Sequence, residues 1–164
     1  MGVRDATGDD RDWIASFLAE QHSVTVARRG ELVQPLDHPM LLAETDGRPA
    51  GLLTYVVDGH TCEILTLHAT AQWHGAGTAL VAAVEDRARR LGCTRLWVLT
   101  TNDNVDALRF YQRRGFRLST LRPGAVDEAR RNLKPQISET GEYGISLRDE
   151  IELTMDLAGE PHTT

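Results

Sequence analysis

The amino-acid sequence predicts a single α/β domain built on a mixed β-sheet and flanked by helices. Short strand patterns dominate its first part, where Asp58-Gly59 is a strong hairpin signal between two apolar runs. In the middle, an apolar run, an amphipathic helical pattern and a second apolar run follow one another. This is the order of a parallel β-α-β unit with a right-handed crossover. A helix and two further strand patterns complete the chain.

The N-terminal half is expected to begin with a helix and to continue as strands. Thr7 and Asp10 form a capping-box pattern, and the apolar residues after them recur with a helical spacing that places them on one face. Residues 22–37 show weak periodicity, which favours a mixed helix–loop segment. Turn signals separate the three strand patterns that come next, at residues 40–44, 50–57 and 61–67.

The second half alternates helices and strands. Apolar residues at helical spacing predict a core-facing helix over 78–91, and Gly92 is a fitting C-terminal stop. A continuous apolar run at 95–99 is typical of a strand that is covered on both faces. Asn102 and Asp103 are expected to cap the following helix. After it, the patterns predict a strand at 116–121, a short helix at 126–133 and a last strand with one wet face at 151–157.

Composition favours a soluble globular protein. The 164 residues are 41% hydrophobic and 26% charged, and the formal net charge of −6 argues against nucleic-acid binding, which normally needs a basic face. The N-terminus lacks an apolar signal region and no run reaches membrane-spanning length, so we expect a cytoplasmic protein with no membrane contact. Cys62 and Cys93 lie in or beside apolar runs without CxxC spacing, which predicts buried thiols. No His, Cys or Asp cluster has the spacing of metal ligands.

Residues 72–78, Gln-Trp-His-Gly-Ala-Gly-Thr, form the most informative stretch. A glycine-rich turn that joins a strand to a helix N-terminus presents backbone N–H groups and a favourable dipole to a phosphate. A P-loop needs a lysine directly after its glycines, and here Thr78 follows Gly77. A dinucleotide fingerprint needs a third glycine where Leu80 stands. The pattern Q/R-x-x-G-x-G/A, the pyrophosphate loop of acyl-CoA transferases, matches residues 72–77 without a gap.

A second motif on the next helix decides between these ligands. Asn104, Ala107 and Tyr111 are spaced i, i+3, i+7 and share one helix face, and Gly115-Phe116 follows. With both motifs in this order, residues 61–118 resemble the GNAT superfamily of N-acetyltransferases. The resemblance implies a mixed, mostly antiparallel central sheet. Its two central parallel strands splay apart, and acetyl-CoA, the acyl donor, lies between them.

The resemblance also implies how acetyl-CoA is bound. Pyrophosphate would rest on the backbone amides of the glycine loop, and pantetheine would run alongside the strand before it. The backbone N–H of Leu67 would face the thioester carbonyl, and Asn104 would contact the pantetheine arm or an ordered water. The expected acetyl-CoA-binding residues are Leu67, His68, Ala69, Gln72, Trp73, His74, Gly75, Ala76, Gly77, Thr78, Asn104 and Ala107.

Two residues are candidates for proton transfer. The resemblance makes Tyr111 the general acid that protonates the CoA thiolate, and an ordinary tyrosine pKa of about 10 keeps the phenol protonated at neutral pH. The alternative is a tyrosine that only packs its ring on the sheet. Glu63 is the candidate general base because its side-chain parity matches that of Leu67. In GNAT enzymes with a glutamate on this strand, it falls about two residues earlier, at Thr61 here. An ordinary exposed glutamate is the alternative.

Neighbouring aromatic and histidine side chains are expected to matter less. His68 has the opposite parity to Glu63 and should face the other side of the sheet. His74 either donates a hydrogen bond near phosphate or is a solvated loop histidine. Trp73 either covers the cofactor or is a partly exposed aromatic.

The predicted function is transfer of an acetyl group from acetyl-CoA to a primary amine of a small molecule. Because both cysteines are expected to be buried, the predicted mechanism is direct attack in a ternary complex. A protein N-terminus or lysine as acceptor, and a non-catalytic acyl-CoA-binding module, are the alternatives. The long connection at 122–144 is expected to line the acceptor site, with Asp149 or Glu150 attracting a cation. Its alternative role is a solvated loop in a homodimer contact.

Overall fold

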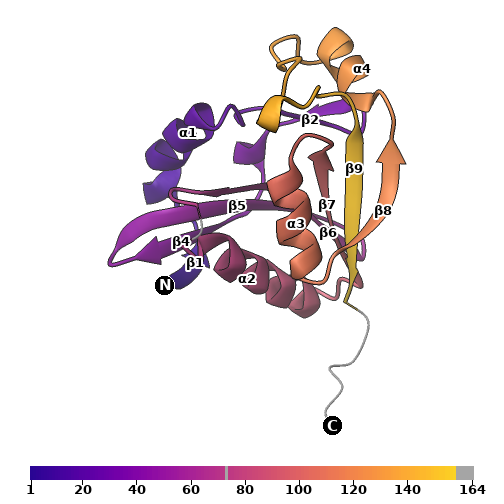
Figure 1. Ribbon diagram of the computed structural model, residues 1–164. Helices are drawn as coiled ribbons and strands as arrows, with labels where there is room; N and C mark the ends of the chain where they lie inside the picture. Colours follow the sequence, from indigo (N-terminus) through magenta and orange to yellow (C-terminus); the bar gives the residue numbers. More distant parts are fainter. Residues whose placement is uncertain (73, 158–164) are drawn as a thin grey trace. The chain divides into compact units, whose positions relative to one another are not determined.

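The computed structural model describes residues 1–72 and 74–157 of the chain (Figure 1). These residues fold into two compact units. Of the described residues, the first unit comprises 1–25, 34–96 (without 73) and 156–157. The second comprises residues 26–33 and 97–155.

The first unit contains most of the antiparallel strands and the two longer helices. As predicted, Thr7 and Asp10 form a capping box, in which the Asp10 carboxylate accepts a hydrogen bond from the Thr7 backbone N–H at 2.8 Å. The elements are β1 (Gly2–Asp5), η1 (Gly8–Asp10), α1 (Arg11–Glu20), η2 (Pro35–Asp37), β4 (Met40–Thr45), β5 (Arg48–Asp58), β6 (Thr61–Ala69), α2 (Ala76–Arg90) and the start of β7 (Arg95–Thr101).

The second unit contains the rest of β7 and the C-terminal elements, together with a hairpin from the first part of the chain. Its elements are β2 (Val26–Arg28), β3 (Glu31–Val33), α3 (Val105–Arg113), β8 (Arg117–Arg122), α4 (Ala125–Asn132), η3 (Glu142–Gly144) and β9 (Glu150–Asp156).

The strands form a mixed, mostly antiparallel sheet. Its strand order is β1-β4-β5-β6-β7-β9-β8, and β2 and β3 pair separately as a hairpin. Strands β6 and β7, which are connected through α2, form the parallel pair. Near their starts, the Thr94 backbone N–H donates to the His60 carbonyl at 2.7 Å. The predicted α/β class with a mixed sheet is therefore confirmed.

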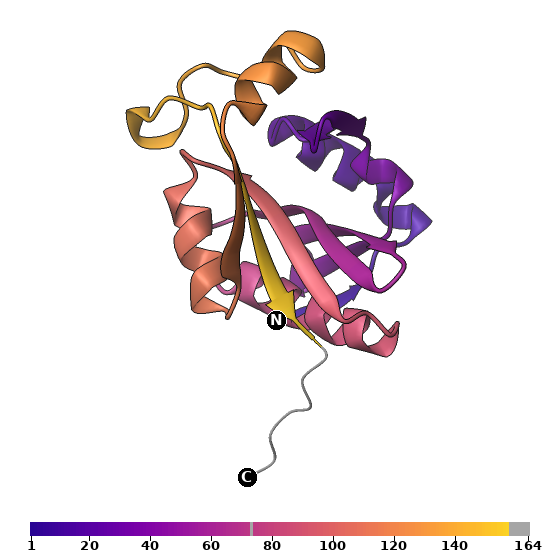
Figure 2. The same ribbon diagram turned by 90° about the vertical axis from the view of Figure 1, so that its right-hand side faces the viewer.

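Helices α1 and α2 lie on opposite faces of the sheet in the first unit (Figures 1 and 2). Leu52 of β5 packs in a buried cluster with α1, whereas its neighbour Gly51 faces Leu80 of α2. Successive strand residues point to opposite faces, so the two contacts define the two sides. The α1 members of the cluster are Ile14, Phe17 and Leu18, as the helical spacing predicted.

The prediction of a mixed helix–loop segment at 22–37 was wrong for residues 26–33. This segment contains the β2–β3 hairpin, in which Arg28 pairs with Glu31 across a two-residue turn. Both turn residues have positive φ, +50° for Arg29 and +78° for Gly30, as a type I′ turn requires. An arginine at the first turn position is not a common hairpin signal, and each strand has only three residues.

The prediction of a wet face on the last strand was also wrong. Strand β9 lies between β7 and β8 in the strand order, and both Glu150 and Glu152 on it are buried. These carboxylates are paired with arginines rather than solvated.

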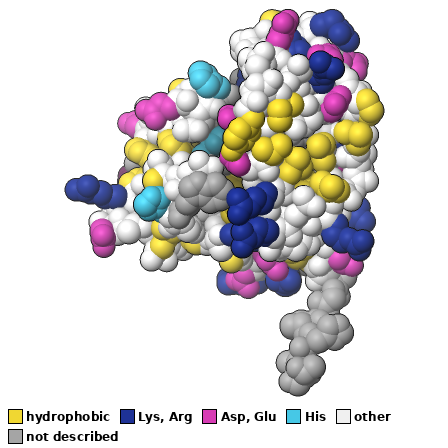
Figure 3. Space-filling model, in the orientation of Figure 1, with side chains coloured by type: hydrophobic (Ala, Val, Ile, Leu, Met, Phe, Trp, Pro, Cys, Tyr) yellow, Lys and Arg dark blue, Asp and Glu magenta, His cyan; other side chains and the backbone are white. Residues whose placement is uncertain are grey.

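Strand β8 is an edge strand in the second unit and exposes apolar side chains. Leu118 and Leu121 are 57% and 59% exposed. Figure 3 shows hydrophobic side chains gathered among charged ones on one face of the molecule. A homodimer contact stays a prediction. Among residues 1–72 and 74–157, no helix is long and apolar enough to cross a membrane.

Candidate active site

The segment that was predicted to cradle a phosphate lies at the start of α2. The helix begins at Ala76, two residues before the predicted start, and Gly75 is its N-cap with φ of +87°. The Ala79 N–H makes the first helical bond, to the Gly75 carbonyl at 3.0 Å, so the Ala76 and Gly77 amides have no intrahelical acceptor. The first turn of this fully described helix carries no acidic residue. These amides and the helix dipole favour an anion here.

A glycine on β5 allows this helix start to pack closely on the sheet. A Cβ at Gly51 would lie 3.0 Å from the His68 carbonyl oxygen, 3.1 Å from Leu80 Cδ1 and 3.2 Å from the Ala76 Cβ. Such contacts are tight for a carbon atom, so any larger residue would push α2 away from β5. Gly51 therefore allows the start of α2 to pack against β5. The motif at residues 72–78 did not predict this role of Gly51.

The pairing of β6 with β5, which includes a β-bulge, determines which backbone groups of β6 point away from β5. Thr70 N–H donates to the Ala50 carbonyl at 2.9 Å, which makes this a hydrogen-bonded pair. Bonded and non-bonded pairs alternate in an antiparallel ladder, so Leu53 and Leu67 form a non-bonded pair. The N–H of Leu67 therefore points away from β5. This is the orientation that the predicted oxyanion contact requires.

The bulge also reverses the predicted side-chain parity of β6. Thr54 is opposite Thr66, but Tyr55 is opposite Ile64, so one residue of β6 is extra between these pairs. Side chains on either side of the extra residue therefore change faces. Glu63, opposite Val56, lies on the same face as Thr66 and not on the face of Leu67.

His68 consequently shares a face with Glu63, and the prediction that it faces the other side was wrong. Its partner Leu52 packs with α1, and the His68 ring lies edge-on to Phe17 at 6.2 Å. Its Nε2 is 2.9 Å from the Ser23 Oγ. Burial lowers the pKa of His68 to about 4, so the ring is neutral at physiological pH.

Glu63 is 2% exposed, so the alternative of an ordinary exposed glutamate was wrong. Thr66 on the same face is also buried, and its hydroxyl bonds Thr54 Oγ1 at 2.9 Å. Burial shifts the pKa of a carboxyl group, and shifted pKa values are common in groups that transfer protons. In the glycine loop, Gln72 and His74 are exposed, and Trp73 lies outside the described residues.

The second predicted motif lies in the second unit. Asn104, rather than Asn102 or Asp103, is the N-cap of α3, and its Oδ1 accepts a hydrogen bond from the Ala107 N–H at 3.2 Å. The Asn104 carboxamide oxygen is thus used by the helix itself. Ala107 is half-buried on the helix that follows.

Tyr111 is 5% exposed and lies in an aromatic cluster. Its ring is edge-on to Phe110 and to Phe116, with centroids 5.2 Å apart in each case. Burial raises the pKa of Tyr111 above its ordinary value, so the phenol stays protonated at neutral pH. Tyr111 therefore packs its ring against two aromatic neighbours and is also protonated, as a general acid must be.

Asn102 and Asp103 hold the segment before β9. Asn102 Oδ1 accepts from the backbone N–H groups of Arg148 and Asp149 at 3.0 and 2.9 Å. Asp103 Oδ2 accepts from the Glu142 N–H at 2.9 Å. A Cβ at Gly141 would lie 2.1 Å from the same carboxylate oxygen, so this contact needs glycine. Sequence reasoning missed the anchoring because the partners are about forty residues apart.

The acidic residues expected to attract a cation have partners within the chain. Asp149 Oδ1 accepts a hydrogen bond from the Gly124 N–H at 2.8 Å. Glu150 is paired with Arg122 at 3.1 Å. The cation at Glu150 is thus supplied by the protein itself.

The cysteines are buried as predicted, and neither is suited to carry an acyl group. Burial raises the pKa of the Cys62 thiol to about 12, and it also raises that of Cys93. Only a thiolate attacks a thioester readily. Within the described part of the chain, no group of three or more His, Cys, Asp or Glu side chains could hold a metal ion.

The structure thus brings the predicted residues together in two groups. Glu63, Leu67 and the α2 start belong to the first unit, and Asn104, Ala107 and Tyr111 belong to the second.

Known proteins resemble this chain in sequence. The sequence model of the Acetyltransferase (GNAT) family matches residues 8–116. The uncharacterized protein YdhI of Bacillus subtilis is 48% identical over 64% of this chain, and the match spans 65% of YdhI. An uncharacterized N-acetyltransferase of Mycobacterium tuberculosis is 31% identical over 70% of this chain and 76% of its own.

A solved structure shares the fold. The GNAT family acetyltransferase from Elizabethkingia anophelis with acetyl-CoA bound has a TM-score of 0.71 at 22% identity, over 94% of this chain and 97% of its own. The family model covers more than half of the chain, and the sheet and both motifs have the expected order. The chain belongs to the GNAT family of acetyltransferases.

Proposed function

We propose that this protein transfers an acetyl group from acetyl-CoA to a primary amine of a small molecule, by direct attack in a ternary complex. One observation carries the proposal. The Gly75-capped start of α2 follows a strand whose Leu67 N–H points away from its antiparallel neighbour. An anion cradle and an oxyanion donor are thus supplied by one strand–loop–helix segment.

Binding of the donor would rely mainly on backbone groups. The amides of residues 72–77 would hold the pyrophosphate, because a helix N-terminus offers unpaired donors and a favourable dipole. The Leu67 N–H would stabilise the negative charge that develops on the thioester oxygen during attack. Asn104 would reach the pantetheine arm with its amide N–H₂ group, since its oxygen caps α3.

Proton transfer would use two side chains. An alkyl ammonium with a pKa near 10.4 leaves only about one molecule in 10³ neutral at pH 7, so attack needs a base. Glu63 would accept this proton, which its burial on β6 supports. Tyr111 would donate a proton to the departing CoA thiolate. The phenol of Tyr111 is protonated at neutral pH, as a proton donor must be.

Direct attack is favoured over an acetyl-cysteine intermediate. The burial of Cys62 and Cys93, which raises both thiol pKa values, removes the thiolate that a two-step route needs. Attack by the amine on the thioester breaks the C–S bond and forms the amide. Glu63 would take the ammonium proton before attack and pass it to solvent. The second proton, which the nitrogen loses as the amide forms, would replace the one that Tyr111 gives to the sulfur.

A thiol-release assay tests the proposal. Purified protein is incubated with acetyl-CoA and a panel of amines that includes amino acids, polyamines and aminated antibiotics, with peptides bearing a free N-terminus or lysine as a separate arm. We expect a small amine to accelerate CoA release. Acceleration by the peptide arm alone would favour the protein-acceptor alternative. If no amine accelerates release and calorimetry detects no acetyl-CoA binding, the proposed function is wrong.

A further inference from the structure

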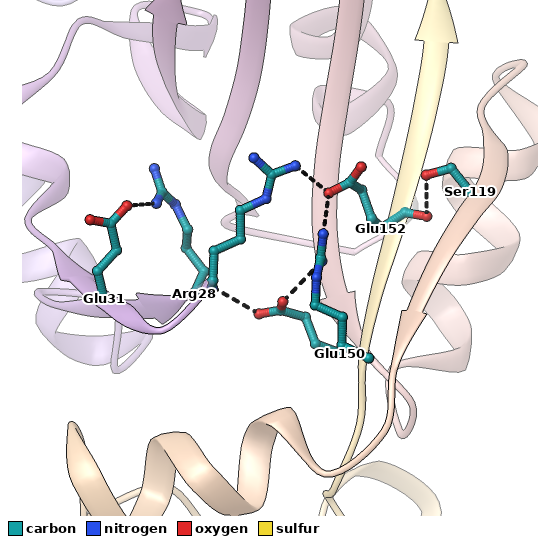
Figure 4. A network of polar contacts seen from close by, with 7 residues as sticks. Arg28, Glu31, Ser119, Glu150 and Glu152 are labelled. Carbon is teal, nitrogen blue, oxygen red and sulfur yellow. Dashed lines mark hydrogen bonds and ion pairs between the residues drawn. The ribbon is translucent and has the colours of Figure 1, made fainter.

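Arg29, at the tip of the β2–β3 hairpin, contacts Trp97 and Glu152 of the second unit through its guanidinium and Glu150 through its backbone N–H. The Arg29 Cζ lies 3.8 Å from the centroid of the Trp97 ring. Its Nη2 donates to Glu152 Oε1, and its backbone N–H lies 3.3 Å from Glu150 Oε2. Figure 4 shows both glutamates of β9 directed toward the arginine side chains. The arrangement combines an aromatic face with carboxylates, which is how proteins bind organic cations.

The walls of this site are buried, whereas its occupant is not. Trp97 is 8% exposed, and the Glu150 and Glu152 side chains are 9% and 10% exposed. The Arg29 side chain is 40% exposed. The occupant can therefore leave into solvent by rotating its own side chain, without unpacking the walls.

The charge balance of the site depends on Arg29. Arg122 of β8 bridges the two carboxylates, with 3.1 Å to Glu150 and 3.0 Å to Glu152. Two negative charges are thus held by one fixed arginine and one arginine from the hairpin. Without Arg29, the buried site would carry one uncompensated negative charge, which is costly and attracts a cation.

The hairpin that supplies Arg29 is a weak element. Each of its strands has three residues, and a two-stranded hairpin of this size has marginal stability by itself. Arg29 also has φ of +50°, a left-handed conformation that costs about 1–2 kcal/mol for a residue with a Cβ. The contacts of Arg29 with Trp97, Glu150 and Glu152, rather than the hairpin turn, therefore keep Arg29 in this position.

We propose that Trp97, Glu150 and Glu152 form a binding site for a guanidinium or primary ammonium group of a small molecule, and that Arg29 occupies this site until the ligand displaces it. A planar guanidinium fits best, because it can stack on the indole and bond a carboxylate at once. An acceptor amine with a second cationic group is a suitable ligand. Binding of such an acceptor rests on the proposed acetyl transfer, whereas binding of a guanidinium or ammonium group at this site does not.

Calorimetry with butylguanidinium, in the absence of acetyl-CoA, tests the site independently of catalysis. Arg29→Gln removes the occupant, so we expect its Kd for butylguanidinium to be at least about tenfold lower than that of the wild-type protein. Butylurea, a neutral molecule of the same shape, should bind neither protein. Arg117→Gln is the matched control, because it removes an exposed arginine of β8 and the same charge. The double variant Arg29→Gln with Glu152→Gln should not show this lower Kd for butylguanidinium.

The fluorescence of Trp97 locates the binding. The chain has three tryptophans, so Trp13→Phe with Trp73→Phe leaves Trp97 as the reporter. Its emission should change with butylguanidinium in Arg29→Gln at the calorimetric Kd. If Arg29→Gln does not fold, Arg29→Lys carries the test, since an ammonium stacks less well and should compete less. Equal butylguanidinium binding by the Arg29 variant and Arg117→Gln, or unchanged Trp97 emission on binding, overturns the proposal.

Discussion

The two units hold their predicted residues with different chemical groups. In the first, the donor segment (residues 63–78) presents backbone amides, and glycines at 51 and 75 determine its geometry. In the second, the anchored segment (residues 138–149) is held by the side chains of Asn102, Asp103 and Arg130. A backbone-built site tolerates side-chain changes but not changes at its glycines. A side-chain-built region loses its order when one partner is removed.

Replacing the catalytic candidate of the second unit is expected to have the largest effect. Tyr111→Phe removes the proton donor but keeps the ring that packs on Phe110 and Phe116. We expect kcat to fall by about 10²–10⁴, with the Kd for acetyl-CoA changed by less than about twofold. Steady-state kinetics and calorimetry measure the two quantities. An unchanged kcat would leave Tyr111 as a packing residue only.

Gly51→Ala tests the backbone side of the comparison. Its Cβ would meet the His68 carbonyl at 3.0 Å, and a carbonyl in a strand cannot move freely. We expect a loss of about 1–3 kcal/mol in the free energy of unfolding, and weaker acetyl-CoA binding because α2 is displaced. Urea denaturation measures the first effect. Gly8→Ala, where nothing lies within 4 Å of the new Cβ, is the control and should change neither.

Glu152→Gln tests the side-chain network. Burial by itself would raise the pKa of Glu152, but hydrogen bonds from Arg29 and Arg122 together lower it below its ordinary value. The stabilisation is therefore present above the unfolded pKa of about 4.3 and is lost as pH falls through the lower folded pKa. Because both arginines are partly solvated, we expect a loss of about 1–2 kcal/mol at pH 7.

The difference in stability between Glu152→Gln and wild type should shrink when denaturation is repeated near pH 3. A difference that stays constant from pH 7 to pH 3 would show that the carboxylate charge is not what stabilises this region.

His68 gives the first unit a separate pH dependence. Burial lowers its pKa to about 4, so the unfolded chain binds a proton below about pH 6.5 while the folded ring stays neutral. Stability is therefore highest above pH 6.5 and falls toward pH 4. We expect about 1–2 kcal/mol of loss between pH 7 and 5 that is absent in His68→Gln. Chemical denaturation at the two pH values measures it, and equal losses in both proteins would contradict the prediction.

His74→Ala should have the smallest effect. His74 is exposed in the glycine loop, and the proposed phosphate contacts come from backbone amides. We expect less than about a twofold change in the KM for acetyl-CoA. A change of tenfold or more would mean that a side chain, rather than the backbone, holds the phosphate.

The sequence allowed the donor segment to be predicted because its geometry is local. The glycines at 75 and 77 and the apolar run before them lie within a few residues of one another, and the helix begins two residues before the predicted Thr78. The β-bulge in β6 was not predictable, because it is a property of pairing with β5. Missing one extra residue was enough to predict opposite faces for Glu63 and His68, which share one face.

The second unit was predicted less completely because its contacts are distant in sequence. The Arg29–Glu152 pair joins residues 123 positions apart, and no periodic pattern records such a contact. Glu150 and Glu152 alternate with apolar residues, which is also the pattern of a solvated strand face. Glutamates that are buried with arginine partners give the same alternating pattern, so only the tertiary structure distinguishes buried glutamates from solvated ones.

The most direct measurement compares the binding of acetyl-CoA with that of acetyl-pantetheine, which has the same thioester but lacks the pyrophosphate. If the start of α2 holds the pyrophosphate, calorimetry should give a Kd for acetyl-CoA at least about a hundredfold lower than for acetyl-pantetheine, and raising the salt concentration should narrow the gap. Equal affinities for the two compounds would contradict the assignment of the donor segment as the acetyl-CoA cradle.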